Sequence, residues 1–272
     1  MVSVHISKLP MFARRFVFCF FAFLSVNSVD SLESTKTLVN LLSADNYVIL
    51  AKSGISTVPT SAIVGNIAVS PIAATAMTGF GLSADPGGGF STSSQLTGQA
   101  FAANYVGSSL LTTAVGAMEA AYTDSAGRVN PDAERLNLGG GALGGVFGGA
   151  TAPLTPGVYT FTVDVTIADT IYFQGSGMDE DEGETDVFII QMTGNLKQVA
   201  NTRVILSNGA KANNIFWQVA GHVTVAADAH MEGTLLAKTR VLFETGSSLY
   251  GRILTQTACV LQMATITQSA GQ

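Results

Sequence analysis

The sequence predicts a mostly β protein that is wound as a β-solenoid, with one long α-helix packed alongside. From residue 154 onward the chain consists of strands of three to seven residues separated by Gly, Asn, Asp or Ser. Related strands also recur, because FIIQM, IFWQV, GTLLA and GRILT are each followed by a second short run, namely LKQV, VTV, VLF and VLQM. Their spacing of roughly 20–28 residues is typical of stacked coils that share one core. The 29 glycines suit the corners between flat faces, where positive φ and little side-chain bulk are needed.

The first 31 residues have the features of a secretory signal peptide. Arg14 and Arg15 precede an apolar run of eleven residues, 16–26, and small and polar residues follow as far as Ser31. A basic start, a short apolar stretch and small residues at its exit define such a peptide, and eleven residues are too few to span a bilayer. The alternative is a buried helix or an uncleaved anchor. Since no later segment is apolar enough to cross a membrane, we expect a secreted, extracellular protein.

The remaining residues, 32–272, are expected to form a single domain, because no Pro-rich or charged linker divides them. Residues 46–82 contain strand-like runs that are interrupted by Gly and Pro. The helix is predicted at about 108–126, where apolar residues recur at helical spacing and an Asp-Ser-Ala-Gly stretch supplies a stop. The Gly-rich segment 139–149 is expected to be a flexible loop. The main coils are expected at about 154–267.

The composition describes a surface that is neutral and rich in hydroxyl groups. Only 12% of the residues are charged, about half of the roughly 25% that is usual for a soluble domain. The chain has 28 Thr and 23 Ser in their place, and 47% hydrophobic residues exclude a disordered chain. The formal net charge is -6 and no basic run is present, so we expect no binding to nucleic acid.

Candidate metal ligands are few and scattered. His222 and His230 flank a VTV strand, and a zinc site would need a third or fourth converging ligand that the sequence lacks. The acidic run between Asp179 and Asp186 could in principle supply oxygens to Ca²⁺, but it lacks the D-x-D-x-D-G pattern of a calcium loop. We interpret that run as a solvated turn. We therefore expect no metal and no cofactor.

No catalytic constellation stands out from the background either. The Gly-rich segment lacks the Lys-Ser/Thr of a phosphate loop, and no Ser lies in a G-x-S-x-G elbow. Without Cys19 of the signal peptide, Cys259 has no partner for a disulfide, and we interpret it as a small buried apolar residue. A polysaccharide lyase would need calcium carboxylates and a basic residue in a cleft, whereas Arg and Lys are scattered singly here. The sequence therefore predicts a protein that is not an enzyme.

Several separate segments, however, resemble those of one family in the family's own order. They are ILAKSGIS, GNIAVSP, GVYTF, FIIQM, LSNGAKANNIFWQV, HMEGTLLA and TGSSLYGRILTQTACVLQ, and together they span nearly all of residues 46–267. The family is that of the ice-binding proteins of cold-adapted microbes. The resemblance implies a discontinuous right-handed β-solenoid of triangular cross-section, with a long helix along one face and N-terminal strands that complete the coils.

The resemblance also implies a function. We expect a monomer that adsorbs to the surface of ice crystals through a flat, helix-free face, causes thermal hysteresis and inhibits recrystallisation, without binding a membrane. Long charged side chains would oppose such adsorption, since they hold their hydration water and lose up to ~2 kcal/mol of rotamer entropy when immobilised. Threonine is stiff at χ1, and stacked strands would repeat it about every 4.8 Å.

Strand alternation and the resemblance together nominate four ice-binding residues. In the triplets VTI and VTV the apolar residues point inward, so Thr166 and Thr224 point outward. The matching triplets place Lys197 and Leu242 on the same face, which makes the array imperfect, and the match to ILAKSGIS places Ser56 near it. The predicted ice-binding residues are therefore Thr166, Thr224, Ser56 and Leu242, with ordinary exposed strand positions as the alternative for each.

The competing function is an extracellular carbohydrate-binding or adhesive β-solenoid. Sugar sites usually present exposed Trp or Tyr rings for stacking. The single Trp of this chain, Trp217, lies inside IFWQV, where we expect it to be buried. Exposed aromatic rings would therefore discriminate between the two functions.

Overall fold

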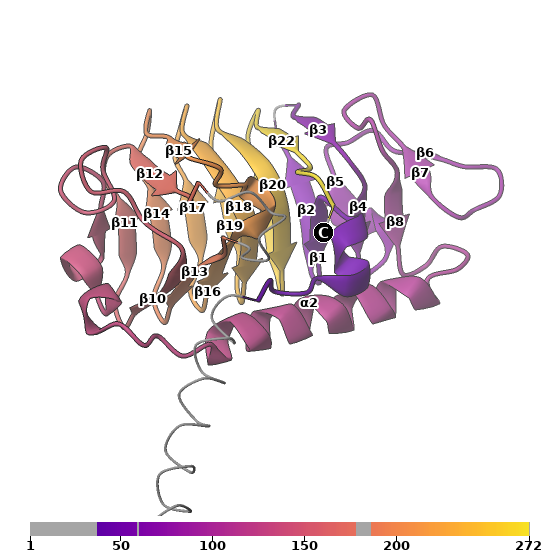
Figure 1. Ribbon diagram of the computed structural model, residues 1–272. Helices are drawn as coiled ribbons and strands as arrows, with labels where there is room; N and C mark the ends of the chain where they lie inside the picture. The colour runs from indigo at the N-terminus through magenta and orange to yellow at the C-terminus, as the bar shows by residue number, and fades with distance from the viewer. Residues whose placement is uncertain (1–36, 59, 178–185, 272) are drawn as a thin grey trace, which may run out of the picture.

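The computed structural model describes residues 37–58, 60–177 and 186–271, and it is a β-solenoid with one long helix along its side (Figure 1). The predicted signal peptide and residues 179–185 of the acidic run lie outside the described residues. Each complete coil passes through three flat sides. Short 3₁₀ helices connect some strands at Leu42–Asn46, Ala74–Ala76, Ala133–Arg135, Leu138–Gly141 and Ala212–Asn214.

The first side is a parallel sheet that we call the helix-side sheet. Its strands follow the spatial order β10-β13-β16-β18-β20-β1-β4-β8, and a short antiparallel pair, β7 and β6, extends it. The bounds are β10 Gly157–Phe161, β13 Phe188–Met192, β16 Ile215–Val219, β18 His230–Ala237, β20 Ser248–Thr255, β1 Ile49–Ala51, β4 Ile67–Val69, β8 Ala100–Ala102, β7 Ser91–Thr92 and β6 Ser83–Ala84.

The second side is an eight-stranded parallel sheet that no helix covers, and we call it the helix-free sheet. Its spatial order is β9-β11-β14-β17-β19-β21-β2-β5. The bounds are β9 Ala142–Leu143, β11 Val165–Ile167, β14 Leu196–Gln198, β17 Val223–Val225, β19 Val241–Phe243, β21 Ala258–Leu261, β2 Gly54–Thr57 and β5 Met77–Thr78. The short runs LKQV, VTV and VLF thus stack in register, as their recurrence predicted. The register of the fourth run, VLQM, was wrong by one residue, because Cys259, Val260 and Leu261 are the residues that pair with Val241, Leu242 and Phe243.

The third side combines two pieces, and we call it the third sheet. One piece is the pair β12 and β15, and the other is made by the N-terminal halves of β18 and β20 with β22 and β3. A bridge between Arg203 and His230 joins them. The bounds are β12 Ile171–Gln174, β15 Val204–Ser207, β22 Thr265–Thr267 and β3 Ala62–Val64.

The solenoid is discontinuous in the chain, as the resemblance implied. Strand β1 pairs with β20, β2 with β21 and β3 with β22, so an N-terminal coil stacks directly on the C-terminal one. Ile49 lies opposite Ile253, and Ser56 lies opposite Val260. In Figure 1 the indigo and yellow segments accordingly lie side by side in the middle of the stack.

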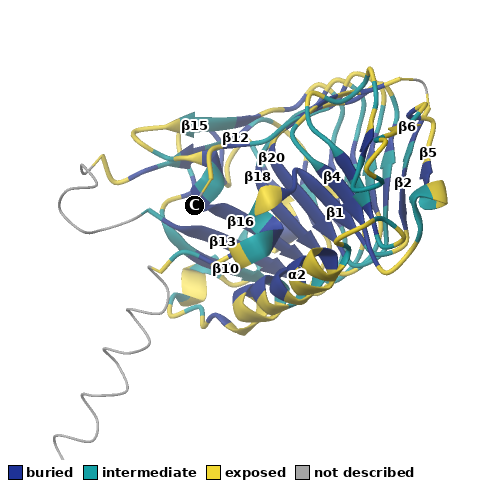
Figure 2. Cartoon of the chain, turned by 90° about the vertical axis from the view of Figure 1, so that its right-hand side faces the viewer, coloured by how far each residue is buried: buried dark blue, intermediate teal, exposed yellow. Residues whose placement is uncertain are grey.

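The core fills the space between the three sides (Figure 2). Trp217 is fully buried, as predicted, with its ring 5.7 Å from that of Phe173 and its Nε1 donating a hydrogen bond to the Glu232 carbonyl. Cys259 is also fully buried as a free cysteine. Alternating inward residues of short strands thus supply one continuous apolar core, which needs no disulfide among the described residues.

Helix α2, Ser109–Gly127, confirms the predicted helix to within one residue at each end. Its buried face packs on the outer surface of the helix-side sheet, where Leu50, Phe216 and Leu236 belong to the same apolar cluster as Leu111 and Met118. Its outer face is exposed to solvent (Figure 2). This second cluster, separate from the core of the solenoid, explains why the helix covers only that sheet.

The C-terminal end of α2 is fastened by side chains rather than by a glycine cap. Gln191, on the outer surface of β13, donates from Nε2 to the carbonyls of Ser125 and Arg128 at 2.6 and 2.7 Å. Its Oε1 accepts a hydrogen bond from Thr160 Oγ1 at 2.9 Å. The last carbonyls of a helix have no hydrogen-bond donor within the helix. The Gln191 amide therefore supplies donors to the Ser125 and Arg128 carbonyls.

The Gly-rich segment 139–149 differs from the flexible loop that the sequence suggested. It contains a 3₁₀ turn and strand β9, which pairs with β11 and ends the helix-free sheet. Gly141 has φ 90°, and a Cβ there would lie 2.2 Å from the Asp164 carbonyl oxygen. The glycine therefore lets the backbone approach the neighbouring corner closely enough for this strand to pair.

The corner between the helix-free sheet and the third sheet is built from a column of left-handed residues. Asn201, Asp228, Gly246 and Met263 all have φ between 48° and 75°. Asn201, Asp228 and Gly246 donate their N–H groups to the next coil, as Asp228 does to the Thr245 carbonyl at 3.0 Å and Gly246 to the Met263 carbonyl at 3.2 Å. Only one of the four is glycine, so three corners hold an L-residue in a region that glycine prefers.

Candidate functional site

The outer surface of the helix-free sheet carries one row of side chains that crosses all eight strands. Register places its members in a line, which we call the central row: Ala142, Thr166, Lys197, Thr224, Leu242, Val260, Ser56 and Thr78. The four residues nominated from the sequence all belong to it. Because adjacent strands lie about 4.8 Å apart, the row is a straight, regularly spaced array.

Strand alternation explains why these side chains point outward. Val165 and Ile167 on either side of Thr166 are fully buried, and so are Val223 and Val225 beside Thr224. On β2 the same alternation buries Thr57, whose Oγ1 donates to Ser61 Oγ at 2.9 Å. The apolar flanks thus hold each strand by its inward face and leave the central residue on the surface.

Four members of the row were not nominated as ice-binding residues from the sequence, namely Ala142, Lys197, Val260 and Thr78. Lys197 was placed there but described as an imperfection, and it is exposed. Val260 lies outward between the fully buried Cys259 and Leu261, in the same pattern as Leu242. Thr78 follows the buried Met77 on a strand of only two residues. The apolar-x-apolar pattern around Val260 was the available signal, but an outward valine is hard to separate from a core residue.

One edge of the central row is a ladder of corner side chains. Asp164 Oδ1 accepts a hydrogen bond from the Asn195 N–H at 2.8 Å, and Asn195 Oδ1 accepts one from the His222 N–H at 3.0 Å. The hydrogen bonds from Asn195 hold the pKa of Asp164 below its ordinary value. The ladder links successive coils and keeps a carboxylate at this edge.

The titratable residues do not converge on a reaction centre. His222 and His230 lie on different sides, with His222 at the corner of the helix-free sheet and His230 on the third sheet. His230 contacts Ser248 Oγ through Nδ1 at 2.8 Å and Glu232 Oε1 through Nε2 at 3.0 Å. Within the described ranges no three His, Cys, Asp or Glu residues are grouped to hold a metal ion. Burial raises the pKa of the Cys259 thiol, so this group stays protonated and unreactive.

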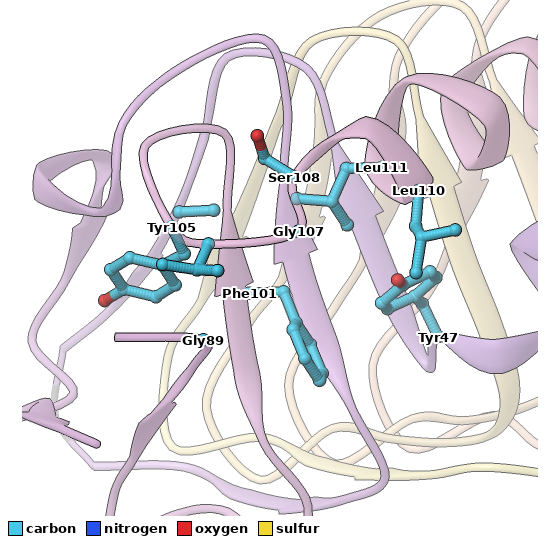
Figure 3. Close-up of a pocket in the computed structure, with 10 residues that line it drawn as sticks. Tyr47, Gly89, Phe101, Tyr105, Gly107, Ser108, Leu110 and Leu111 are labelled. Carbon is cyan, nitrogen blue, oxygen red and sulfur yellow. The ribbon is translucent and has the colours of Figure 1, made fainter. Parts of the chain in front are cut away.

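A small cavity of about 130 Å³ lies at the start of α2, away from the helix-free sheet (Figure 3). Its walls include Tyr47, Phe101, Tyr105, Leu110 and Leu111. Burial raises the pKa of Tyr47, so the phenol there remains protonated near neutral pH. The lining is mainly apolar and brings together no acid–base pair.

No helix in the described part of the chain is both long and apolar enough to cross a membrane.

The helix-free sheet is the most regular outer surface that the structure describes. It is flat, it is built from stiff strands, and its central row carries small or β-branched residues at most positions.

Comparisons with known proteins give a consistent result. A family model described as Ice-binding-like matches residues 49–267. An ice-binding protein of Flammulina populicola is 42% identical over 252 residues, which cover 90% of this chain and 96% of that protein. Ice-binding protein K1-A of Typhula ishikariensis is 44% identical over 231 residues, covering 84% of this chain and 88% of that protein.

Solved structures agree with the sequence relatives. The structure of an ice-binding protein from an Arctic yeast, solved to explain its antifreeze activity, has a TM-score of 0.78 at 42% identity and covers 86% of this chain and 96% of that chain. A domain of ice-binding protein 1 from Shewanella frigidimarina has a TM-score of 0.74 at 26% identity, covering 87% of this chain and 99% of that chain. The same fold is thus shared at two levels of sequence identity.

Proposed function

Because the chain belongs to the ice-binding-like family, we propose that it is an ice-binding protein that adsorbs to ice through the outer surface of the helix-free sheet. The observation that carries this proposal is the central row, which crosses eight parallel strands in register. Thr166, Thr224, Ser56 and Leu242 are the ice-contacting residues nominated on it. The other two sides suit the role less, since α2 covers one and the other is divided into two pieces that are joined by the bridge between Arg203 and His230.

The chemistry of adsorption follows from the side chains of the row. Thr166 and Thr224 are β-branched and held between buried neighbours, so their hydroxyls and methyls keep fixed positions. A hydroxyl can anchor an ordered water molecule, while the methyl beside it limits the other hydrogen bonds that this water could form. Each contact is weak, but little conformational entropy is lost on binding because the sheet is already rigid. Adsorbed molecules pin the growing ice front, which lowers the freezing point without melting the crystal and inhibits recrystallisation.

The remaining features of the function belong to the same proposal. We propose that residues 1–31 are a signal peptide and that residues 32–272 are secreted as a single, monomeric, non-enzymatic domain that acts outside the cell. Neither a cofactor nor a metal takes part in adsorption. A carbohydrate-binding or adhesive role is not favoured, since the relatives carry ice-binding names and Trp217 is fully buried, while the exposed rings of Tyr250 and Phe147 lie on separate elements.

The test is a bulky substitution in the middle of the row. Thr224→Tyr places a ring above the flat surface and holds its neighbours away from the crystal, so thermal hysteresis should fall sharply. The matched control is Thr265→Tyr, an exposed strand threonine on the third sheet, which should keep the hysteresis of the parent. The free energy of unfolding of both variants should lie within about 0.5 kcal/mol of that of the parent, as is usual for substitutions at exposed positions. Normal hysteresis in both folded variants, Thr224→Tyr and Ser56→Tyr, would refute this choice of face.

A further inference from the structure

The helix-free sheet is not uniform along its length, because its ionisable side chains lie at one end. Around the central row of β11, β14, β17 and β19, the outward and flanking positions include Asp164, Lys197, His222, Arg240 and Glu244. Around β21, β2 and β5 they are Ala258, Val260, Gln262, Gly54, Ser56, Val58, Ala76 and Thr78, none of which is ionisable. We call this second set the neutral half.

We propose that ice contact is concentrated on the neutral half, and that the end of the sheet nearest β11 contributes little. This inference rests on the proposed ice-binding function and refines where on the face the contact occurs. It makes Val260, Ser56 and Thr78 the principal contacts and leaves Thr166, five strands from Ser56, at the periphery.

Hydration supports this division of the face. A charged group orders its nearest waters around itself, and those waters cannot take the positions of an ice lattice without loss of solvation. Lys197 and Arg240 are exposed, and their long side chains lose much rotamer freedom if they are immobilised against a surface. Lys52, two residues before Gly54 in the chain, forms an ion pair with Glu119 of α2, with Nζ 2.5 Å from Oε1.

The backbone also flattens the neutral half. Gly54 has no side chain at its edge, and a Cβ there would lie 2.8 Å from the Ala76 carbonyl oxygen on the neighbouring coil. Opposite Gly54 lies Ala258, so two adjacent coils present only hydrogen or methyl groups at this edge. From β21 to β5 the strands span roughly 10 Å, and alternate residues along each strand lie roughly 7 Å apart. The neutral half is therefore a continuous two-dimensional surface.

The loss-of-function test compares tyrosine at the two ends of the same row. Ser56→Tyr and Thr78→Tyr should each remove most of the thermal hysteresis, whereas Ala142→Tyr, on the exposed outer surface of β9, should keep most of it. Thermal melting and circular dichroism of each purified variant establish that it is folded, and Thr78→Tyr serves if Ser56→Tyr does not fold. Equal losses from Ala142→Tyr and Ser56→Tyr, or a larger loss from Ala142→Tyr, would overturn the inference while leaving the face itself intact.

The gain-of-function test removes the two exposed cationic side chains of the face. The double variant Lys197→Thr/Arg240→Thr replaces these long side chains by short neutral ones and leaves Glu244 in place, so its thermal hysteresis should exceed that of the parent. The control is Arg203→Thr on the third sheet, which removes one positive charge elsewhere and should change nothing. An unchanged or lower hysteresis in the folded double variant would overturn the inference. If the parent protein itself has no thermal hysteresis, the proposed function fails, and this outcome is distinct from both of the others.

Discussion

Replacing Gln191 by leucine should detach the end of helix α2 while leaving the proposed ice-binding face, the helix-free sheet, unchanged. The substitution keeps nearly the same volume but removes the amide that donates to the Ser125 and Arg128 carbonyls and accepts from Thr160 Oγ1. Gln191 is only 6% exposed, so water has little access to replace these partners. At about 1 kcal/mol net for each of the three hydrogen bonds, the free energy of unfolding should fall by about 3 kcal/mol.

Thermal melting followed by circular dichroism measures this effect. For a domain of this size about 1 kcal/mol corresponds to about 2–4 °C, so the midpoint should fall by about 6–12 °C. Gln174→Leu, on the half-exposed outer surface of β12, is the matched control and should change stability by less than about 0.5 kcal/mol. Below its melting point the Gln191→Leu variant should retain full thermal hysteresis. A midpoint within about 2 °C of the parent would show that the helix end does not depend on this amide.

Two further predictions concern the corner column and the buried thiol. Met263 has φ 48° and is half exposed, so Met263→Gly should raise the free energy of unfolding by about 0.5–1 kcal/mol, measured by urea denaturation. Gly246→Ala should lower the free energy of unfolding by about 1–3 kcal/mol, because φ is 75° and the new Cβ would lie 2.2 Å from Asp228 Oδ1. Equal free energies of unfolding for the two variants would contradict the role given to the column. Native protein should not react with iodoacetamide at Cys259, because the thiol is fully buried, and mass spectrometry measures this reaction. Native protein should also keep its thermal hysteresis in EDTA, which is measured by the growth arrest of single ice crystals. Rapid alkylation of the folded protein would show that the site opens, and a large loss in EDTA would point to a metal instead.

Local alternation was enough to predict the inward and outward residues of most short strands. In Val223-Thr224-Val225 the two apolar residues are buried and the central one is half exposed, as period-two patterning requires. Helix α2 was predictable for the same reason, since its apolar residues recur every three or four positions. These features depend on neighbours in the sequence, and so the sequence alone specifies them.

Features that depend on distant contacts were not predictable from the pattern. Strand β9 forms because Gly141 permits close approach to the Asp164 corner, and the Gly-rich segment carries no strand signal of its own. Val260 and Thr78 join the central row only because β21, β2 and β5 happen to be neighbours in space. The order of strands across the discontinuity came from the family resemblance, because no local pattern states that Ile49 pairs with Ile253.

The junction between β1 and β20 has a consequence for how the protein folds. The pairing joins segments near opposite ends of the described chain, so its formation closes a loop of roughly 200 residues. Proteins dominated by such distant pairings fold slowly, since the entropy of closing the loop is lost before the contacts form. Strands β2 and β21 meet at the same junction, so a nascent chain that lacks its last coil has no surface on which they lie together. Activity should therefore develop only after strands β20 to β22 have been synthesised, and its appearance during refolding would report the formation of this junction.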